Sequence, residues 1–277
     1  MNYIKRSIKG IIYRWKKAKI EISKFPNNIE LSWRYPLRQF FRTKLLIATY
    51  VKSSTGVYHY LSSDLIDEYV IQEMLGEGRY MFFPILPKCV KDELDNNGVI
   101  LDVGAYNGSW AMELLNEHAN AEVIFVEPSQ SRCYNIQKSL NKNKINSKTT
   151  IVSAGIAHKK GPAWLVMSEY GSWGDWLEYK KPIDSKETIK VETITLLDAI
   201  NNKKPTIIKC NAEGGEFELI KQLFAANLRP KFMVLMIHPE MGNTDNLWES
   251  LIQAGYSIEI IRKSSSRPVW HAKWERS

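Results

Sequence analysis

An aspartate, two glycines and a glutamate lie where two successive apolar runs of the sequence end. Asp102 belongs to the first run and is followed by Gly104 and Gly108, and Glu127 follows the second run. Open α/β sheets bind ligands beyond the carboxyl ends of their strands, where a carboxylate can accept hydrogen bonds from ribose hydroxyls. Glycine lets the backbone turn tightly and approach such a ligand. This spacing predicts a nucleoside site.

The glycine spacing distinguishes between classes of nucleoside cofactor. The loop from Gly104 to Gly108 reads GxxxG, not the GxGxxG that seats the pyrophosphate of NAD, and no Gly-Lys pair followed by Ser or Thr marks an ATP site. A strand-end acid beside a loop without phosphate-binding features favours a nucleoside that carries no phosphates. We therefore predict S-adenosylmethionine as the cofactor.

Acidic residues and a histidine follow two later apolar runs and could complete a methyl-transfer site. Transfer from a sulfonium needs donor and acceptor at near-attack distance, and a base helps when the acceptor is a hydroxyl. Glu213 and Glu216 follow the run 206–210, and His238 follows the run 232–237. We predict His238 as the base because its ordinary pKa lies nearest neutrality. The alternatives are a loop histidine bonded to backbone and glutamates that cap the next helix.

A divalent ion between Glu213, His238 and Glu240 is chemically conceivable, but no metal site is predicted. The three cysteines, Cys89, Cys133 and Cys210, lie far apart in no metal-binding pattern. Their spacing indicates neither a structural zinc nor a disulfide framework, and it favours a reducing cytoplasm.

Aromatic residues are concentrated in an insertion at about 162–190, between the third and fourth apolar runs. Flat rings suit a sugar or a lipid-linked glycan, so we predict acceptor contacts from Tyr170, Trp173 and Trp176. The alternative is that these rings fill the rim of a sheet or an oligomer contact. The sequence leaves both open and does not fix the oligomeric state.

Short apolar runs alternate with helical stretches from residue 99 onward. Strands are expected at 99–103, 122–126, 150–154, 206–210, 232–237, 256–261 and 269–274, and helices at 110–117, 131–141, 215–226 and 247–254. This alternation predicts a mostly parallel seven-stranded sheet with helices on both faces. The last two strands are joined by too few residues for a parallel crossover, so the last strand should be antiparallel.

Three segments resemble the FkbM-type family of class I S-adenosylmethionine-dependent methyltransferases. They read ILDVGAYNG at 100–108, VEP at 126–128 and IKCNAEGGE at 208–216. The resemblance spans about residues 80 to 275 and implies a Rossmann-like fold with a reversed last strand. It also implies cofactor contacts from the first segment and from the end of the third strand, namely from Ala105, Tyr106, Ser153 and Ala154.

The third segment departs from the family at two positions. Asn211 stands where the family usually has aspartate, and Gly215 where alanine is usual. An asparagine cannot act as a base, so a cofactor-binding protein without turnover stays an alternative. We place Asn211 in the predicted transfer site with Glu213, Glu216 and His238.

The positive charge of the chain is concentrated near its start. Residues 1–50 hold twelve Lys and Arg against two acids, which is +10, so the net +8 leaves −2 for residues 51–277. Residues 1–80 are expected to form a basic, mostly helical extension and residues 81–277 the catalytic domain. Apolar residues of 4–22 form one helical stripe, which suits either contact with an anionic membrane surface or docking on the domain itself.

These observations predict a cytoplasmic S-adenosylmethionine-dependent O-methyltransferase that acts on a hydroxyl of a glycan or a natural product. The basic leader would hold it near membrane-borne acceptors. A nucleic-acid methyltransferase is the first alternative, prompted by the pI of about 9.2. No partner nucleic acid is predicted, because the charge lies outside the catalytic part and aromatic residues do not alternate with the basic ones.

Overall fold

The computed structural model of the 277-residue chain describes residues 29–31, 49–62, 66–76, 78–145, 148–168, 174–182, 187–263 and 266–275. The predictions for the leader at 1–24, for Tyr170 and for Trp173 lie outside these residues. Within the described part, no helix is long and apolar enough to cross a membrane.

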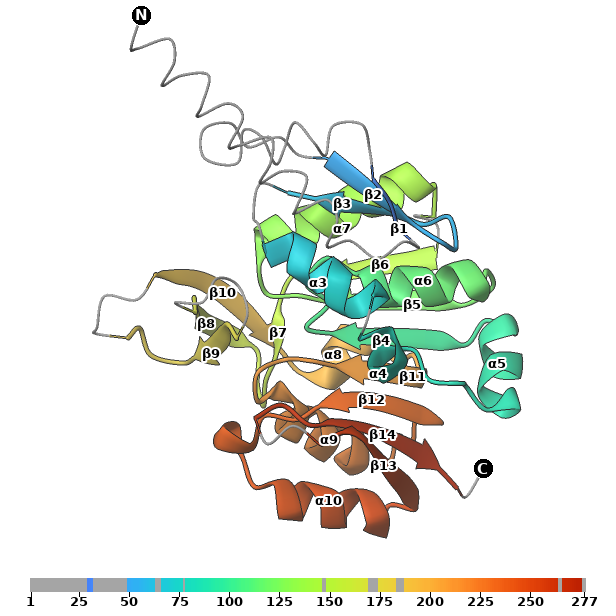
Figure 1. Cartoon of the computed structure of the whole chain (residues 1–277). Coiled ribbons are helices and arrows are strands. Elements are labelled where there is room, and N and C mark those ends of the chain that lie inside the picture. Colours follow the sequence, from blue (N-terminus) through green and yellow to red (C-terminus); the bar gives the residue numbers. More distant parts are fainter. Residues whose placement is uncertain are drawn as a thin grey trace, which may run out of the picture.

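A seven-stranded sheet forms the centre of the molecule, in the order β13-β14-β12-β11-β4-β5-β6 (Figure 1). All its neighbouring pairs are parallel except those of β14, which is antiparallel to both β12 and β13. The prediction of one reversed last strand is confirmed. The strands are β4 (Val99–Val103), β5 (Glu122–Val126), β6 (Thr149–Val152), β11 (Pro205–Cys210), β12 (Phe232–Met236), β13 (Tyr256–Arg262) and β14 (Val269–Trp274).

Helices cover both faces of this sheet because alternate strand residues point to opposite sides. Ile100 packs in one apolar cluster, and its neighbour Leu101 packs in the other. The first cluster includes side chains of α3 (Ile66–Leu75), α4 (Arg79–Phe82), α5 (Lys88–Asp95), α6 (Ser109–Glu117) and α7 (Gln130–Asn143). The second includes those of α8 (Leu196–Ile200), α9 (Gly215–Ala225) and α10 (Thr244–Gln253).

The part of the chain before residue 80, for which we predicted a mostly helical extension, contains strands among its described residues. Its described residues include a three-stranded antiparallel sheet of β1 (Ile29–Leu31), β2 (Thr49–Ser53) and β3 (Tyr58–Leu61). The helix α3 follows this sheet along the chain. The physical reason for the sheet is a period of two, since buried and half-buried residues alternate along both β2 and β3.

This extension shares its core with the catalytic part. Val51 and Leu61 of the small sheet and Met74 of α3 are buried in the same cluster as Trp110 of α6. A buried hydrogen bond of 2.8 Å also joins His59 Nε2 to Oε1 of Glu113 in α6. Figure 1 shows the extension lying along α6 and α7. The two predicted units are therefore packed into one body.

The insertion after the third strand is more regular than expected. It forms a four-stranded sheet in the order β7-β10-β8-β9, which projects from the edge of the body (Figure 1). The strand expected at 150–154 is present as β6 but ends at Val152. Ser153 and Ala154 are not part of a strand, and β7 follows them. The strands are β7 (Gly155–Ile156), β8 (Gly161–Val166), β9 (Trp176–Glu178) and β10 (Thr188–Ile194).

Candidate active site

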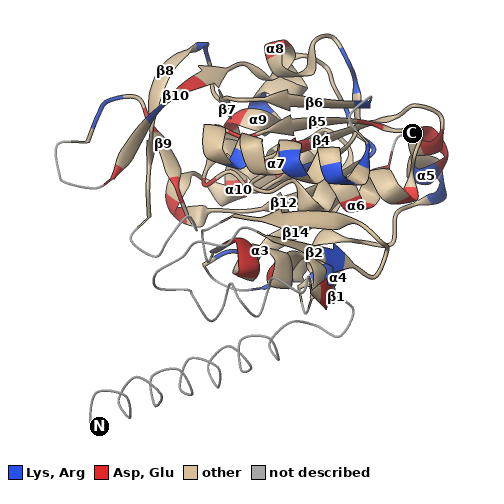
Figure 2. Cartoon of the chain, turned by 90° about the horizontal axis from the view of Figure 1, so that it is seen from above, with Lys and Arg blue, Asp and Glu red and all other residues tan. Residues whose placement is uncertain are grey.

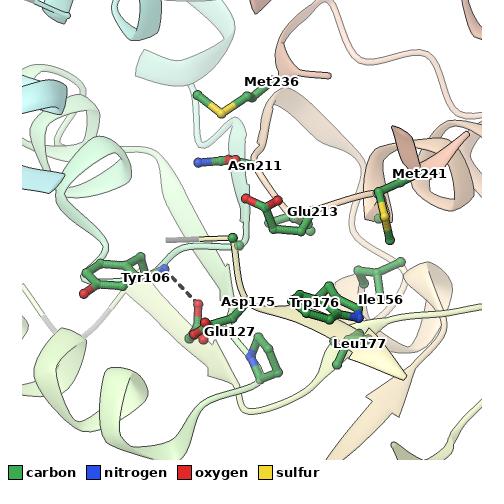
Figure 3. Close-up of a pocket in the computed structure, with 18 of the residues that line it drawn as sticks. Tyr106, Glu127, Ile156, Asp175, Trp176, Leu177, Asn211, Glu213, Met236 and Met241 are labelled. Carbon is green, nitrogen blue, oxygen red and sulfur yellow. Dashed lines mark hydrogen bonds between the residues drawn. The ribbon is translucent and has the colours of Figure 1, made fainter. Parts of the chain in front are cut away.

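A cavity of about 910 Å³ lies at the carboxyl ends of β4, β5, β11 and β12. The glycine loop after β4 and the strand end after β5 line one side, where Tyr106 and Glu127 lie (Figure 3). The loop after β11 contributes Asn211 and Glu213 to the other side, near Met236 of β12. The cavity therefore joins the two groups of residues that the sequence singled out.

The glycine loop is held closely against the neighbouring strand end. Gly104 has a φ of 66°, and a Cβ atom there would lie 1.9 Å from the carbonyl oxygen of Asn211. Beneath the loop, Lys209 Nζ donates hydrogen bonds to Asp102 Oδ1 at 3.0 Å and to the Gly104 carbonyl at 2.8 Å. Asp102 is fully buried, so it supports the loop and does not line the cavity. Ala105 and Gly108 also lie behind the lining.

Glu127 presents a buried carboxylate to the cavity. Its Oε2 accepts a hydrogen bond from the Tyr106 N–H at 2.9 Å, and its Oε1 accepts one from the Ser129 N–H at 3.0 Å. Burial raises the pKa of Glu127, and the Arg132 guanidinium and the two N–H groups oppose that shift. Each oxygen keeps a second lone pair for a ligand hydroxyl.

Apolar side chains extend the cavity beyond Glu127. Ile156, Leu177 and Trp176 lie together on that side (Figure 3), and Ala154 lines the same region. A planar base fits such a lining because it can bury both faces against apolar atoms. Ser153 is exposed and lies outside the lining, so of the predicted pair only Ala154 faces the cavity.

Glu213 is the carboxylate that faces the other end of the cavity. Its backbone is left-handed, with a φ of 44°, which is uncommon for a residue with a side chain and is typical of functional sites. Its Oε1 lies 3.1 Å from His238 Nε2, and its Oε2 lies 3.4 Å from Arg267 Nη2. The strained backbone and the two cations fix the carboxylate at the end of β11.

The structure opposes the predicted role of His238 as the base. His238 is fully buried behind the lining, and its Nδ1 lies 3.0 Å from Glu216 Oε1. Burial lowers the pKa of His238, but the hydrogen bonds and charges of Glu213 and Glu216 outweigh it and raise the pKa to about 9. The imidazole is therefore charged at neutral pH and has no free lone pair for a proton. It lies between the carboxylates of Glu213 and Glu216 and holds that of Glu213 in position.

Asn211 and Glu216 occupy different positions around this end. Asn211 lines the cavity, and its Oδ1 is buried with no hydrogen-bond partner among the described residues. That oxygen can accept a hydrogen bond from a bound ligand. Glu216 is fully buried behind the loop, where its Oε2 accepts a hydrogen bond from the Gly214 N–H at 3.0 Å. It shapes the turn into α9 and does not reach the cavity.

Several lining residues were not predicted from the sequence. Arg132 and Asp175 lie beside Glu127, Lys209 lies under the glycine loop, and Met236 ends β12. Lys209 is inside the third family-like segment, so that segment carried a signal for it. Arg132 and Asp175 belong to no recognised pattern and are brought together only by folding.

The described residues contain no cluster of three or more His, Cys, Asp or Glu side chains arranged to hold a metal ion. All three cysteines are free.

Comparison with known protein families identifies the family to which this chain belongs. The sequence matches the Methyltransferase FkbM domain over residues 102–258, which is more than half of the chain. The chain belongs to the FkbM methyltransferase family. The three segments that carried the resemblance lie at the cavity, so the family match and the geometry concern the same residues.

Several solved structures of other proteins are similar to this chain, and a comparison with curated proteins finds no match. The precorrin-6y C5,15-methyltransferase of Geobacter metallireducens GS-15 is 16% identical, covers 68% of this chain and 86% of that chain, and has a TM-score of 0.39. Sp1610 of Streptococcus pneumoniae, in complex with S-adenosyl-L-methionine, is 12% identical, with 69% and 72% covered and a TM-score of 0.41. TrmK of M. capricolum, in complex with S-adenosyl-homocysteine, is 9% identical, with 69% and 70% covered and a TM-score of 0.40.

This FkbM methyltransferase uses S-adenosylmethionine, and its cavity fits that cofactor. Glu127 offers two carboxylate oxygens where ribose hydroxyls can donate, and Ala154, Ile156 and Leu177 offer an apolar place for the adenine. The unpartnered Oδ1 of Asn211 can accept a hydrogen bond from the amino group of the methionine part. When bound, the cofactor supplies a methyl group on a sulfonium.

Proposed function

We propose that this enzyme is an O-methyltransferase that methylates a hydroxyl group of a glycan or a related natural product. The observation that carries the proposal is the carboxylate of Glu213. It faces the cavity from the loop after β11, and its position is fixed by His238 and Arg267. A carboxylate at that place can accept the proton that a hydroxyl loses when it is methylated.

The charges around Glu213 favour an acceptor that is not a polyanion. The lining at this end holds Glu73, Glu213 and Glu240 together with Arg262 and Arg267. Each arginine is paired with a carboxylate. Arg262 Nη1 lies 3.4 Å from Glu73 Oε1, and Arg267 Nη1 lies 2.5 Å from Glu240 Oε1. With three carboxylates and two paired arginines, this end attracts a phosphate backbone poorly. It suits neutral hydroxyl groups, which can donate to carboxylates and accept from guanidinium groups.

Two outer parts of the described chain carry charges of both signs, whereas α7 carries basic residues and no acidic ones. Acidic and basic residues both occur on α5 and on the sheet β8 to β10, as Figure 2 shows in red and blue. Nucleic-acid binding generally uses a concentrated basic face. A cytoplasmic location and a membrane role for the leader belong to the same proposal and rest on the sequence alone.

Intact-mass analysis of acceptor candidates tests the proposal. The full chain would be incubated with S-adenosylmethionine and panels of neutral glycans, hydroxylated natural products and RNA. We expect a gain of one methylene on a neutral acceptor, and none when the cofactor is omitted. Methylation confined to RNA would overturn the proposal. Cofactor binding without transfer to any panel would favour a non-catalytic binding protein.

A further inference from the structure

We propose that Arg132 is a positioning residue that holds the cofactor-binding carboxylate of Glu127 and ties it to the insertion sheet through Asp175. This role deepens the cofactor site and does not depend on the identity of the acceptor. Arg132 lies in the first turn of α7, shortly after Glu127 ends β5. All three side chains line the cavity.

The three side chains form a buried ionic chain. Those of Glu127, Arg132 and Asp175 are 2%, 12% and 1% exposed. Arg132 Nη1 lies 3.5 Å from Glu127 Oε1, while Arg132 Nη2 donates a hydrogen bond to Asp175 Oδ2. Two buried carboxylates so close to each other require a cation, because burial and mutual repulsion both disfavour the charged form. Arg132 supplies it.

The guanidinium of Arg132 is held on its flat side as well as at its edges. Its Cζ lies 4.7 Å from the centre of the Tyr106 ring, in a cation–π contact. Tyr106 also has a left-handed backbone, with a φ of 55°, and its N–H donates to Glu127. These contacts therefore hold Tyr106 of the glycine loop, Glu127 and Arg132 in fixed positions relative to one another.

Asp175 extends this chain to a distant part of the sequence. It lies just before β9 in the insertion, 43 residues from Arg132. Its Oδ1 accepts a hydrogen bond from the Ser168 N–H at 2.8 Å, so one carboxylate joins the end of β8, the start of β9 and α7. The insertion is thereby attached to the cofactor site by a charge pair, in addition to the apolar contacts of Ile156 and Leu177.

The consequence for the cofactor concerns the charge of Glu127. Burial raises the pKa of Glu127, and Arg132 is the largest opposing influence. The other titratable or charged groups around Glu127 are Cys133 of α7, Tyr106 of the glycine loop, Lys209 of β11 and Asp175 of the insertion. An ionised carboxylate accepts hydrogen bonds about twice as strongly as a neutral group. Arg132 thus favours the ionised form of Glu127, which accepts hydrogen bonds from a ribose diol more strongly.

Calorimetric titration with S-adenosylmethionine from pH 6 to 9 tests this role. The unaltered chain should show a nearly constant Kd. Arg132→Gln should raise the Kd about 10- to 100-fold at pH 6.5, the range of a lost charge-assisted hydrogen bond. The loss should shrink toward pH 9 as Glu127 ionises. Arg132→Lys keeps the cation and should restore most of the affinity, and Asp175→Asn should weaken binding a few-fold.

Arg229→Gln is the matched control, since Arg229 is a half-buried arginine that stacks on Phe224 away from the cavity. It should bind like the unaltered chain, and melting temperatures would show that each variant is folded. Unchanged affinity in Arg132→Gln, or a loss that is the same at every pH, would overturn the proposal. Failure of the unaltered chain to bind would overturn the cofactor assignment with it. Failure to find an acceptor touches only the proposed function.

Discussion

The two ends of the cavity are built in different ways. At the cofactor end, strand termini and backbone N–H groups of the central sheet hold Glu127, and Gly104 packs directly on the backbone of Asn211. At the end proposed to hold the acceptor, called the acceptor end below, Glu73 comes from the extension and Arg267 from the connection between β13 and β14. The first end is set by the fold itself, whereas the second is assembled from segments added around it. This difference teaches that the two ends depend on separate parts of the chain, so substitutions can test them one at a time.

The largest effect should come from closing the space at Gly104. In Gly104→Ala the new Cβ would meet the Asn211 carbonyl at 1.9 Å, and the left-handed backbone adds about 1–2 kcal/mol of strain. We expect cofactor binding to be lost or the melting temperature to fall steeply, as measured by calorimetry and thermal unfolding. Gly56→Ala is the control, because Gly56 also has a positive φ, 94°, but no atom within 4 Å of the new Cβ. Equal effects in both variants would contradict the close packing.

Exchanging one carboxylate at each end should separate binding from chemistry. Glu213→Gln should lower kcat about 10²- to 10⁴-fold, the range of general-base catalysis, and leave the cofactor Kd within about threefold. Glu127→Gln should do the reverse, with a Kd raised about 10- to 100-fold. Stopped-time transfer assays and calorimetry on both variants measure this. If both substitutions changed only the Kd, Glu213 would not be a base.

The charge of His238 predicts a pH dependence at the acceptor end. Its pKa is raised from 6.5 to about 9 in the folded protein. The stabilisation it gives is complete below pH 6.5 and is lost as the pH rises through 9. Unfolding free energy measured from pH 6 to 10 should fall over this range. The double variant His238→Asn with Glu216→Gln should lack this component, and a fall of the same size in it would assign the effect to other groups.

Trp176 should give the smallest effect. It is half-buried in the lining, and its Nε1 donates a hydrogen bond to Glu178 at 3.0 Å. Trp176 lies beside Ile156 and Leu177, where the adenine is placed, so we expect Trp176→Leu to raise the Kd of S-adenosylmethionine about 3- to 10-fold through loss of aromatic contact. Calorimetric titration with the cofactor would measure it. Tyr179→Leu serves as a comparison, because Tyr179 is half exposed at the edge of the same lining.

The sequence predicted the central sheet well because its signals are local. The continuous apolar runs predicted the observed ends of β4 and β5. The short connection between β13 and β14 was enough to predict that β14 is antiparallel to its neighbours. The small sheets were missed although β2 alternates clearly between buried and half-buried residues. Both β2 and β3 are short, and the polar side chains of Thr49, Lys52 and His59 lie among their apolar residues, so neither strand forms a continuous apolar run.

The site was predicted in part, for a related reason. Residue types at strand ends located Glu127, Asn211 and Glu213, which all line the cavity. The role of His238 depends on its charge, and that charge is set by two carboxylates that only the folded chain brings beside it. Arg132 and Asp175 are far apart in sequence, so no spacing rule could pair them.

The core shared by the extension and α6 limits how many residues can be removed from the N-terminal part of the chain. Val51, Leu61 and Met74 are buried in the same apolar cluster as Trp110, and His59 is hydrogen-bonded to Glu113 of the same helix. A fragment that started at residue 81 would uncover this apolar surface and leave the Glu113 carboxylate without its buried partner. Such a minimal version should aggregate on expression, so attempts to shorten the enzyme by protease or by cloning should stop before β2.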